Sequence, residues 1–245
     1  MITVHRQKKM KSDSIRQTLW KNEYDHLRGI NLGYGNDIPY AVSLYRGILL
    51  RDKISNSPHV LDIGCGKGRI GMHLAEMGCR ITGIDFIRSA LQEFSRIAKE
   101  RNKEQNITLI RQDINLPWNV PDRSVDAVFA VTVLDNLVNT DQQVHVKNEI
   151  LRVLKQSGMV VVEWYTSQDG YYGYLLGNSP QKDRGILCDP NNKIAFKIYT
   201  KQEVMSLFGA SFEMLAEKDA SFESVKYGQT YKRHSHILAL RRKHQ

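Results

Sequence analysis

The chain has 245 residues, 41% of them hydrophobic and 25% charged, which is an average composition for a globular protein. The formal net charge of +9 favours anionic partners, and three widely spaced cysteines exclude a disulfide framework or a zinc finger. No apolar run is long enough to span a membrane and no secretory signal is visible, so the sequence predicts a cytoplasmic protein without a membrane partner.

Two helices are predicted ahead of the first strand. Residues 15–27 and residues 40–51 carry apolar residues at helical spacing. A loop that bears glycine and asparagine separates them. We interpret residues 1–55 as an N-terminal arm and helical cap.

Residues 56–165 alternate short apolar runs with amphipathic stretches, and we interpret them as a cofactor-binding core. The apolar runs predict strands at residues 59–63, 80–84, 107–111, 125–131 and 159–164. The stretches between them predict three helices. The first covers residues 70–77, the second begins at a cap formed by Ser89, and the third covers residues 141–155 with Gly158 as the terminator. Strands that alternate with helices in this way indicate a doubly wound, mostly parallel α/β sheet.

The alternation ends after residue 165. Residues 166–200 are interpreted as a substrate lid, and residues 201–245 as a C-terminal helix and a strand pair. A capping box that begins at Thr200 opens this helix. The two strands, at 212–215 and 237–240, have no helix between them, so they are expected to pair antiparallel. We expect the whole chain to form one domain around a seven-stranded sheet.

The most informative segment is VLDIGCGKG, residues 60–68. A predicted strand runs directly into Gly64, Gly66 and Gly68, and a helix begins at once. Glycine lets the chain turn sharply and lets a ligand approach the backbone. Read from Gly66 to Gly71, the same glycines also fit a dinucleotide-binding pattern, so the loop alone does not identify the ligand.

Three aspartates stand at the ends of successive predicted strands. Asp62 lies two residues ahead of the first glycine, and Asp85 ends the second strand, where a carboxylate can hold ribose hydroxyls. Asp113 follows the third strand, where it can accept a hydrogen bond from an adenine amino group while Ile114 packs on the ring. Together these residues predict a slot for an adenosine that carries an amino acid, with its cationic end near Asp62.

In this order the segments resemble the class I S-adenosylmethionine-dependent methyltransferases. The resemblance covers residues 56–165 and rests on VLDIGCGKG, GIDFI, RQDI, SVDAVFAVTVLDNL and LKQSGMVVVEW. It implies a Rossmann-like methyltransferase fold with an antiparallel last strand, with S-adenosyl-L-methionine as cofactor and S-adenosyl-L-homocysteine as product. The implied cofactor-binding residues, from the methionine end to the adenine, are Asp62, Gly64, Gly66, Gly68, Val131, Asp85, Phe86, Asp113 and Ile114.

Candidate contacts to the methyl acceptor follow the fourth and fifth strands. Asp135 is the polar residue best placed to act as a base, although aspartate also commonly begins helices. Glu163 is expected either near the acceptor or paired with the first helix of the core. Aromatic rings can stack on a planar or cationic acceptor, and they can equally form a lid without a chemical role. The aromatic candidates are Tyr24, Trp164, Tyr165, Tyr171 and Tyr172.

We therefore expect transfer of a methyl group from S-adenosylmethionine to a nitrogen or oxygen of a small molecule. An RNA or protein methyltransferase that uses the basic surface is the alternative, and nucleic acid is not favoured because no recognition motif supports it. The basic run from Tyr231 onward is interpreted as a solvated edge strand. A nicotinamide-dependent oxidoreductase and a non-catalytic subunit with the same fold are further alternatives. No metal site is predicted, and the acceptor and the oligomeric state stay open.

Overall fold

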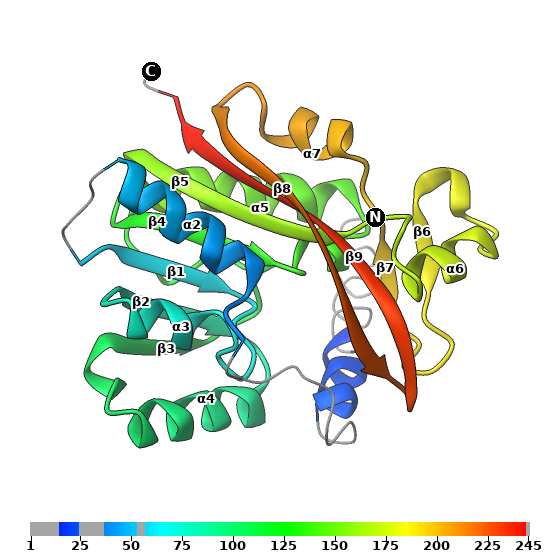
Figure 1. Ribbon diagram of the computed structural model, residues 1–245, viewed down its shortest axis with the longest axis horizontal. Coiled ribbons are helices and arrows are strands. Elements are labelled where there is room, and N and C mark those ends of the chain that lie inside the picture. The colour runs from blue at the N-terminus through cyan, green and yellow to red at the C-terminus, as the bar shows by residue number, and fades with distance from the viewer. Residues whose placement is uncertain (1–14, 25–36, 53–56, 244–245) are drawn as a thin grey trace, which may run out of the picture.

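The computed structural model describes residues 15–24, 37–52 and 57–243. Its centre is a seven-stranded sheet in the order β3-β2-β1-β4-β5-β9-β8 (Figure 1). The strands are β1 (His59–Ile63), β2 (Arg80–Asp85), β3 (Ile107–Arg111), β4 (Val125–Val131), β5 (Leu154–Tyr165), β8 (Phe212–Lys226) and β9 (Gln229–Arg242). The first five run parallel, and β9 runs antiparallel to both β5 and β8. The predicted fold class is confirmed.

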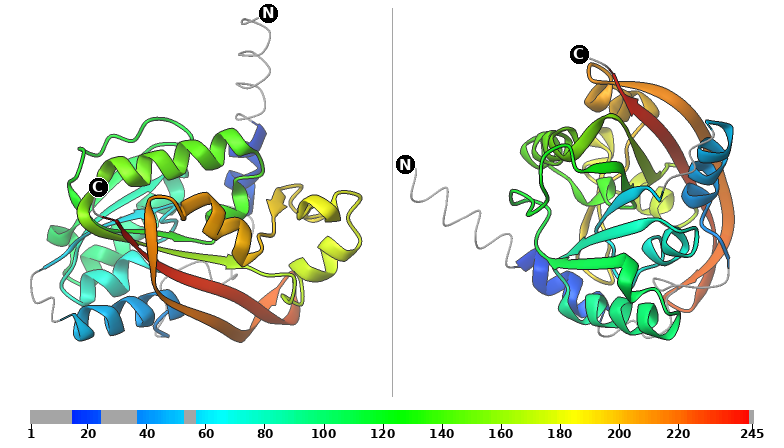
Figure 2. Two further views of the ribbon diagram at one scale, coloured as in Figure 1. Left: turned by 90° about the horizontal axis from the view of Figure 1, so that it is seen from above. Right: turned by 90° about the vertical axis from the view of Figure 1, so that its left-hand side faces the viewer.

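Helices cover both faces of this sheet (Figure 2). One face carries α2 (Tyr40–Arg51), α3 (Gly71–Glu76) and α4 (Arg88–Glu100), whose apolar sides pack on the strands. The other face carries α5 (Thr140–Val153) and α7 (Lys201–Phe208). Parallel strands covered on both faces must be apolar on both, which explains why β4 is an almost continuous apolar run.

Alternation along β5 decides which side chains reach each face at the carboxyl end of the sheet. Val161 packs in the core beneath α2 and α3, so Glu163 and Tyr165 point to that same face. Trp164 points to the opposite face and packs in the core beneath α5 and α7. Asp62 in β1 shares the face of Glu163, because its neighbours Leu61 and Ile63 lie in the opposite core.

The segment after β5 forms a small unit of its own beyond the carboxyl ends of the parallel strands. It contains α6 (Tyr172–Gly177), a short 3-10 helix η3 (Lys182–Arg184), and a two-stranded sheet of β6 (Ile186–Cys188) and β7 (Ala195–Lys197). Figure 1 shows this segment in yellow at the same end of the sheet as the dark blue helix over residues 15–24. The sequence did not predict β6 or β7.

The β8–β9 hairpin differs most from the prediction. The two strands pair from Phe212 with Arg242 to Lys226 with Gln229, far beyond the predicted 212–215 and 237–240. The basic run from Tyr231 was expected on a sheet edge, and this is wrong because β9 lies between β5 and β8.

Two local boundaries were also wrong, and a third is tested only in part. Helix α4 begins at Arg88 with Ile87 at the cap position, so Ser89 lies inside the helix. Helix α5 ends at Val153, and Gly158 lies within β5 instead of ending a helix. The predicted helix over residues 15–27 is described only over 15–24, and its last three residues lie outside the described chain.

Candidate active site

The glycine loop after β1 adopts a conformation that favours glycine. Gly64, Gly66 and Gly68 have φ angles of +65°, +52° and +87°, in the region that L-residues rarely occupy. A Cβ on Gly68 would lie 2.3 Å from the ring of Phe94, and one on Gly66 would lie 2.5 Å from Oη of Tyr24. The side chains of Phe94 and Tyr24 therefore pack directly against the backbone of this loop, and they leave no room for a Cβ at Gly68 or Gly66.

Asp62 is buried at the end of β1 with one oxygen unused. Its exposed fraction is 2%, and Oδ2 has no hydrogen-bond partner among the described residues. Burial raises the pKa of Asp62 to about 7, against the opposing charge of Arg69 and a backbone hydrogen bond from Gly71. A buried carboxylate with an unused oxygen is costly, so this position is suited to a ligand that brings a cationic hydrogen-bond donor.

Asp85 braces the glycine loop from the end of β2. The backbone N–H of Gly66 donates to Oδ2 at 2.9 Å, and that of Ile87 donates to Oδ1 at 2.8 Å. Burial raises the pKa of Asp85 in spite of these bonds. Each carboxylate oxygen can accept more than one hydrogen bond, so Asp85 keeps capacity for the hydroxyls of a ribose.

Both carboxylate oxygens of Asp113 already accept hydrogen bonds, and the sequence did not predict the residues that donate them. Arg16 donates to Oδ2 at 2.6 Å and Gln17 at 3.2 Å, while the backbone and side chain of Asn115 donate to Oδ1. Burial opposes ionisation, yet Arg16 and these hydrogen bonds hold the pKa of Asp113 below its usual value. The Arg16 guanidinium also lies 5.5 Å from the ring centroid of Phe86, the ring that is predicted to contact the adenine.

Tyr24 places the other end of the same helix on the glycine loop. Burial raises its pKa well above the usual value, and the charge of Asp85 adds to the effect. The ammonium of Lys67, within the loop, lies 5.7 Å from the Tyr24 ring. The helix over residues 15–24 therefore crosses the carboxyl edge of the sheet from Asp113 to the glycine loop.

Val131 and Ile114 flank this edge as apolar groups, both 7% exposed. After Val131 the chain turns through Thr132, which has a φ of +54°. The backbone N–H of Thr132 donates to the carbonyl of Glu163 at 2.8 Å. This bond fixes the end of β4 against the end of β5, and it places Glu163 beside the predicted methionine position.

Two buried acids, Asp135 and Glu163, lie after β4 and near the end of β5, where contacts to the acceptor are predicted. Asp135 lies in the 3-10 helix η2 (Leu134–Asn136), and its Oδ2 accepts from the backbone N–H of Tyr165 at 3.4 Å. Burial, with a smaller effect from the charge of Glu163, raises the pKa of Asp135 well above its usual value. Burial also raises the pKa of Glu163, whose Oε1 accepts from the hydroxyl of Ser235 at 2.7 Å.

Tyrosines form one wall beside these acids. The rings of Tyr165 and Tyr172 lie 5.0 Å apart, and the guanidinium of Arg233 lies 4.3 Å and 5.4 Å from their centroids. Tyr171 packs against Tyr172 and donates its hydroxyl hydrogen bond to Asp189. Tyr165 and Tyr172 thus face the carboxyl edge, whereas the hydroxyl of Tyr171 is committed to the lid.

Trp164, predicted as a substrate contact, lies elsewhere. It is fully buried on the opposite face, where Nε1 donates to the carbonyl of Tyr199 at 2.8 Å. Period-two alternation places it there, since Glu163 and Tyr165 on either side face the glycine loop. Its placement corresponds to core packing, and we do not retain Trp164 as an acceptor contact.

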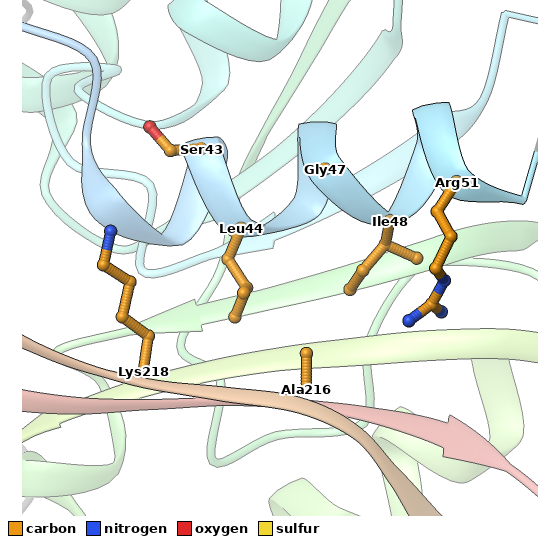
Figure 3. Close-up of a pocket in the computed structure, with 7 residues that line it drawn as sticks. All are labelled: Ser43, Leu44, Gly47, Ile48, Arg51, Ala216 and Lys218. Atoms are coloured by element: carbon orange, nitrogen blue, oxygen red, sulfur yellow. The ribbon is translucent and has the colours of Figure 1, made fainter.

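Two clefts lie apart from these groups. A cleft of about 300 Å³ lies between α2 and β8 and is lined by residues such as Leu44, Gly47 and Lys218 (Figure 3). A second cleft of about 560 Å³ lies on the Trp164 face of the sheet, beside His234. Neither is lined by the glycine loop or by the aspartates that end the parallel strands. Among the described residues no group of acids, histidines and cysteines could hold a metal ion, and no helix could cross a membrane.

Sequence reasoning missed the cations of the site. Arg16, Arg69 and Arg233 belong to three distant parts of the chain, and the sheet and the first helix bring them to one edge. Arg69 directly follows the glycine motif, so its position was the one signal in the sequence. The partners of Arg16 and Arg233 are 97 and 64 residues away, which no local pattern reveals.

Comparison with known proteins gives a family for the core. Residues 60–158 match a family model described as a methyltransferase domain. The ubiquinone biosynthesis O-methyltransferase of Rickettsia akari is 29% identical over 174 residues, which are 68% of this chain and 60% of that protein. This chain therefore spans less than two thirds of the length of that relative.

Solved structures share the fold at low sequence identity. A SAM-dependent methyltransferase from Methanosarcina mazei superposes with a TM-score of 0.68 and 19% identity, covering 80% of this chain and 98% of that one. The 1,6-didemethyltoxoflavin-N1-methyltransferase of Burkholderia thailandensis, solved with 1,6-didemethyltoxoflavin and S-adenosylhomocysteine, has a TM-score of 0.63 and 15% identity, covering 96% and 90%. Residues 60–158 thus match a methyltransferase domain, and the sheet order is that of the S-adenosylmethionine-dependent methyltransferases that this chain resembles.

Proposed function

We propose that this chain transfers the methyl group of S-adenosylmethionine to a nitrogen or oxygen of a small molecule. The observation that carries the proposal is Oδ2 of Asp62, a buried carboxylate oxygen without a partner among the described residues, beside the glycine loop. The ammonium group of S-adenosylmethionine is a donor of the charge and size that this oxygen needs. The charge and the hydrogen-bonding capacity of Asp62 therefore fit the cofactor.

The remaining cofactor contacts follow the same edge of the sheet. Asp85 would hold the ribose, Phe86 and Ile114 the faces of the adenine, and Asp113 its amino group once Arg16 moves away from Oδ2. The backbone of the glycine loop and of Val131 would meet the methionine end. Bound there, S-adenosylmethionine supplies a methyl group already activated by its sulfonium.

The chain then has to align the acceptor with that methyl group and exclude water. Orientation alone can contribute roughly 7–11 kcal/mol to lowering the barrier. We propose that the helix over residues 15–24 and residues 166–200 enclose the acceptor from two sides, with Tyr24 on one and Tyr172 on the other. The rest of the predicted cap up to residue 36 lies outside the described residues. Asp135, the predicted base, or the neighbouring Glu163 would accept a proton from an acceptor that carries one.

Two arguments support a small molecule as the acceptor, namely the activities of similar proteins and the proposed enclosure of the acceptor by two segments of the chain. One similar protein is a ubiquinone biosynthesis O-methyltransferase, and a protein of similar structure is a 1,6-didemethyltoxoflavin-N1-methyltransferase. No observation in the described residues favours RNA or protein as the acceptor. A cytoplasmic location stays a prediction, drawn from the cysteine usage.

Titration calorimetry with S-adenosylhomocysteine tests the cofactor assignment, with NADH as the competing ligand. We expect saturable binding of S-adenosylhomocysteine and none of NADH. Transfer of labelled methyl groups to a metabolite extract and to purified RNA then tests the acceptor class. Label in the small-molecule fraction supports the proposal, whereas label in RNA alone contradicts it.

A further inference from the structure

Three buried carboxyl groups at the carboxyl edge each keep one oxygen without a partner among the described residues. They are Oδ2 of Asp62, Oδ1 of Asp135 and Oε2 of Glu163, on residues that are 2%, 1% and 5% exposed. The ammonium of the cofactor accounts for Asp62 under the proposed function. Because buried polar atoms nearly always have a partner, the free oxygens of Asp135 and Glu163 indicate that a further ligand donates to them.

Fixed contacts orient both carboxyl groups. Ser235 holds Oε1 of Glu163, and the backbone N–H of Tyr165 holds Oδ2 of Asp135. The second oxygen of each group is left for another donor. Glu163 pairs in register with Val131, so these oxygens lie next to the proposed methionine position, where an acceptor atom has to reach the methyl group.

Nearby cations do not balance these acids. Arg233 is paired with Asp169 at 2.7 Å, and Lys226 lies 3.9 Å from both Glu23 and Asp189. The charge of Arg69 favours ionisation of both Asp62 and Glu163, and the charge of Arg233 favours ionisation of Asp135. Among the described residues, two arginines, Arg69 and Arg233, face these three acids and Asp169. The acids outnumber the cations, so the space beside them favours a positively charged occupant.

The tyrosine wall has the chemistry that such an occupant requires. Lys226 lies 4.6–5.4 Å from the ring centroids of Tyr171, Tyr172 and Tyr227, and Arg233 stacks on Tyr165. Aromatic faces stabilise cations by their quadrupole. The tyrosines of this region therefore already stabilise two cations of the chain itself, beside the free carboxyl oxygens.

We propose that the acceptor is an amine that is protonated in solution, held through its nitrogen by Glu163 and Asp135, so that the product is an N-methylated amine. This inference rests on the proposed function. The ammonium first gives a proton to Oε2 of Glu163. The lone pair of the resulting neutral amine then forms the new N–C bond with the methyl group. The C–S bond breaks at the same time, and the electron pair of that bond stays on sulfur.

Three probes of one carbon skeleton test this charge preference. Phenethylamine, phenethyl alcohol and phenylacetate are titrated into the protein saturated with S-adenosylhomocysteine, and binding is followed by calorimetry. We expect the amine to bind at least about tenfold more tightly than the alcohol, and phenylacetate to bind most weakly. Equal binding of amine and alcohol, tighter binding of phenylacetate, or no binding of any probe overturns the inference.

Variants separate this inference from the proposed function. Glu163→Gln and Asp135→Asn should each reduce the preference for amine over alcohol to about threefold or less, while S-adenosylhomocysteine affinity is retained and the melting temperature is not lowered. Glu93→Gln, an exposed change on α4, should leave the preference intact. Retention of the full preference in both acid variants contradicts the inference. If S-adenosylhomocysteine itself fails to bind the wild-type chain, the proposed function fails instead.

Discussion

Replacing Asp62 with asparagine is expected to stabilise the ligand-free protein. Burial raises the pKa of Asp62 from 3.8 to about 7, so the unfolded chain releases a proton between these values that the folded chain keeps. Stability is therefore lost as pH rises through this window. The difference of about three pKa units corresponds to roughly 4 kcal/mol at pH 7 and above. Asparagine does not titrate, so Asp62→Asn removes this dependence.

The same substitution is expected to weaken cofactor binding. The ammonium of S-adenosylhomocysteine loses a hydrogen bond to an ionised group, worth about 1.5–3 kcal/mol, or roughly 10- to 150-fold in Kd. In the wild type the ligand requires ionised Asp62, so Kd should rise about tenfold for each pH unit below 7. In the variant, Kd should stay constant over this range.

Urea denaturation and titration calorimetry between pH 5 and 8 measure the two effects. Asp122→Asn serves as the control, because this carboxylate is exposed and its ion pair with Arg152 is at the surface. A wild-type Kd that is independent of pH, or an Asp62→Asn protein that binds as tightly as the wild type, would refute the assignment of Asp62 to the cofactor ammonium.

Three further substitutions test the rest of the site. Arg16→Met removes the shorter of the two side-chain hydrogen bonds to Oδ2 of Asp113 and leaves only that from Gln17. It should tighten S-adenosylhomocysteine binding by about tenfold in calorimetry; weaker binding would mean that Arg16 contacts the bound ligand. Gly68→Ala combines a φ of +87° with a clash against Phe94 and should cost about 2–5 kcal/mol of unfolding free energy in urea; an unchanged midpoint would contradict the loop geometry. Trp164→Phe removes a buried hydrogen bond and should cost about 1 kcal/mol of stability. It should leave Kd for S-adenosylhomocysteine unchanged, and a marked rise in Kd would argue against its placement in the core.

Much of the sheet was predictable because its strands are covered on both faces. The bounds of β1, β3 and β4 match the predicted 59–63, 107–111 and 125–131, since short runs rich in apolar residues there are bounded by glycine or polar residues. The β8–β9 hairpin was predictable only at its buried end. Most of β8 beyond Leu215 is exposed or half-buried and polar, so its pairing comes from β9 and leaves no apolar signal.

The residues of the candidate site also differ in how far the sequence predicts them. Asp62, Asp85 and the glycines stand at strand ends within local motifs, so their shared edge follows from parallel topology. The contact of Arg16 with Asp113 spans 97 residues, and that of Ser235 with Glu163 spans 72. Such contacts depend on how the first helix and the last strand dock, which composition and spacing do not encode.

A crystal structure with S-adenosylhomocysteine tests the account most directly. We predict the ligand's ammonium against Oδ2 of Asp62, its ribose hydroxyls on Asp85, and its adenine beside Phe86, with Arg16 displaced from Asp113. The free oxygen of Glu163 should face the sulfur across an acceptor-sized space. A ligand bound elsewhere, or one that leaves Asp62 without a contact, would contradict the account.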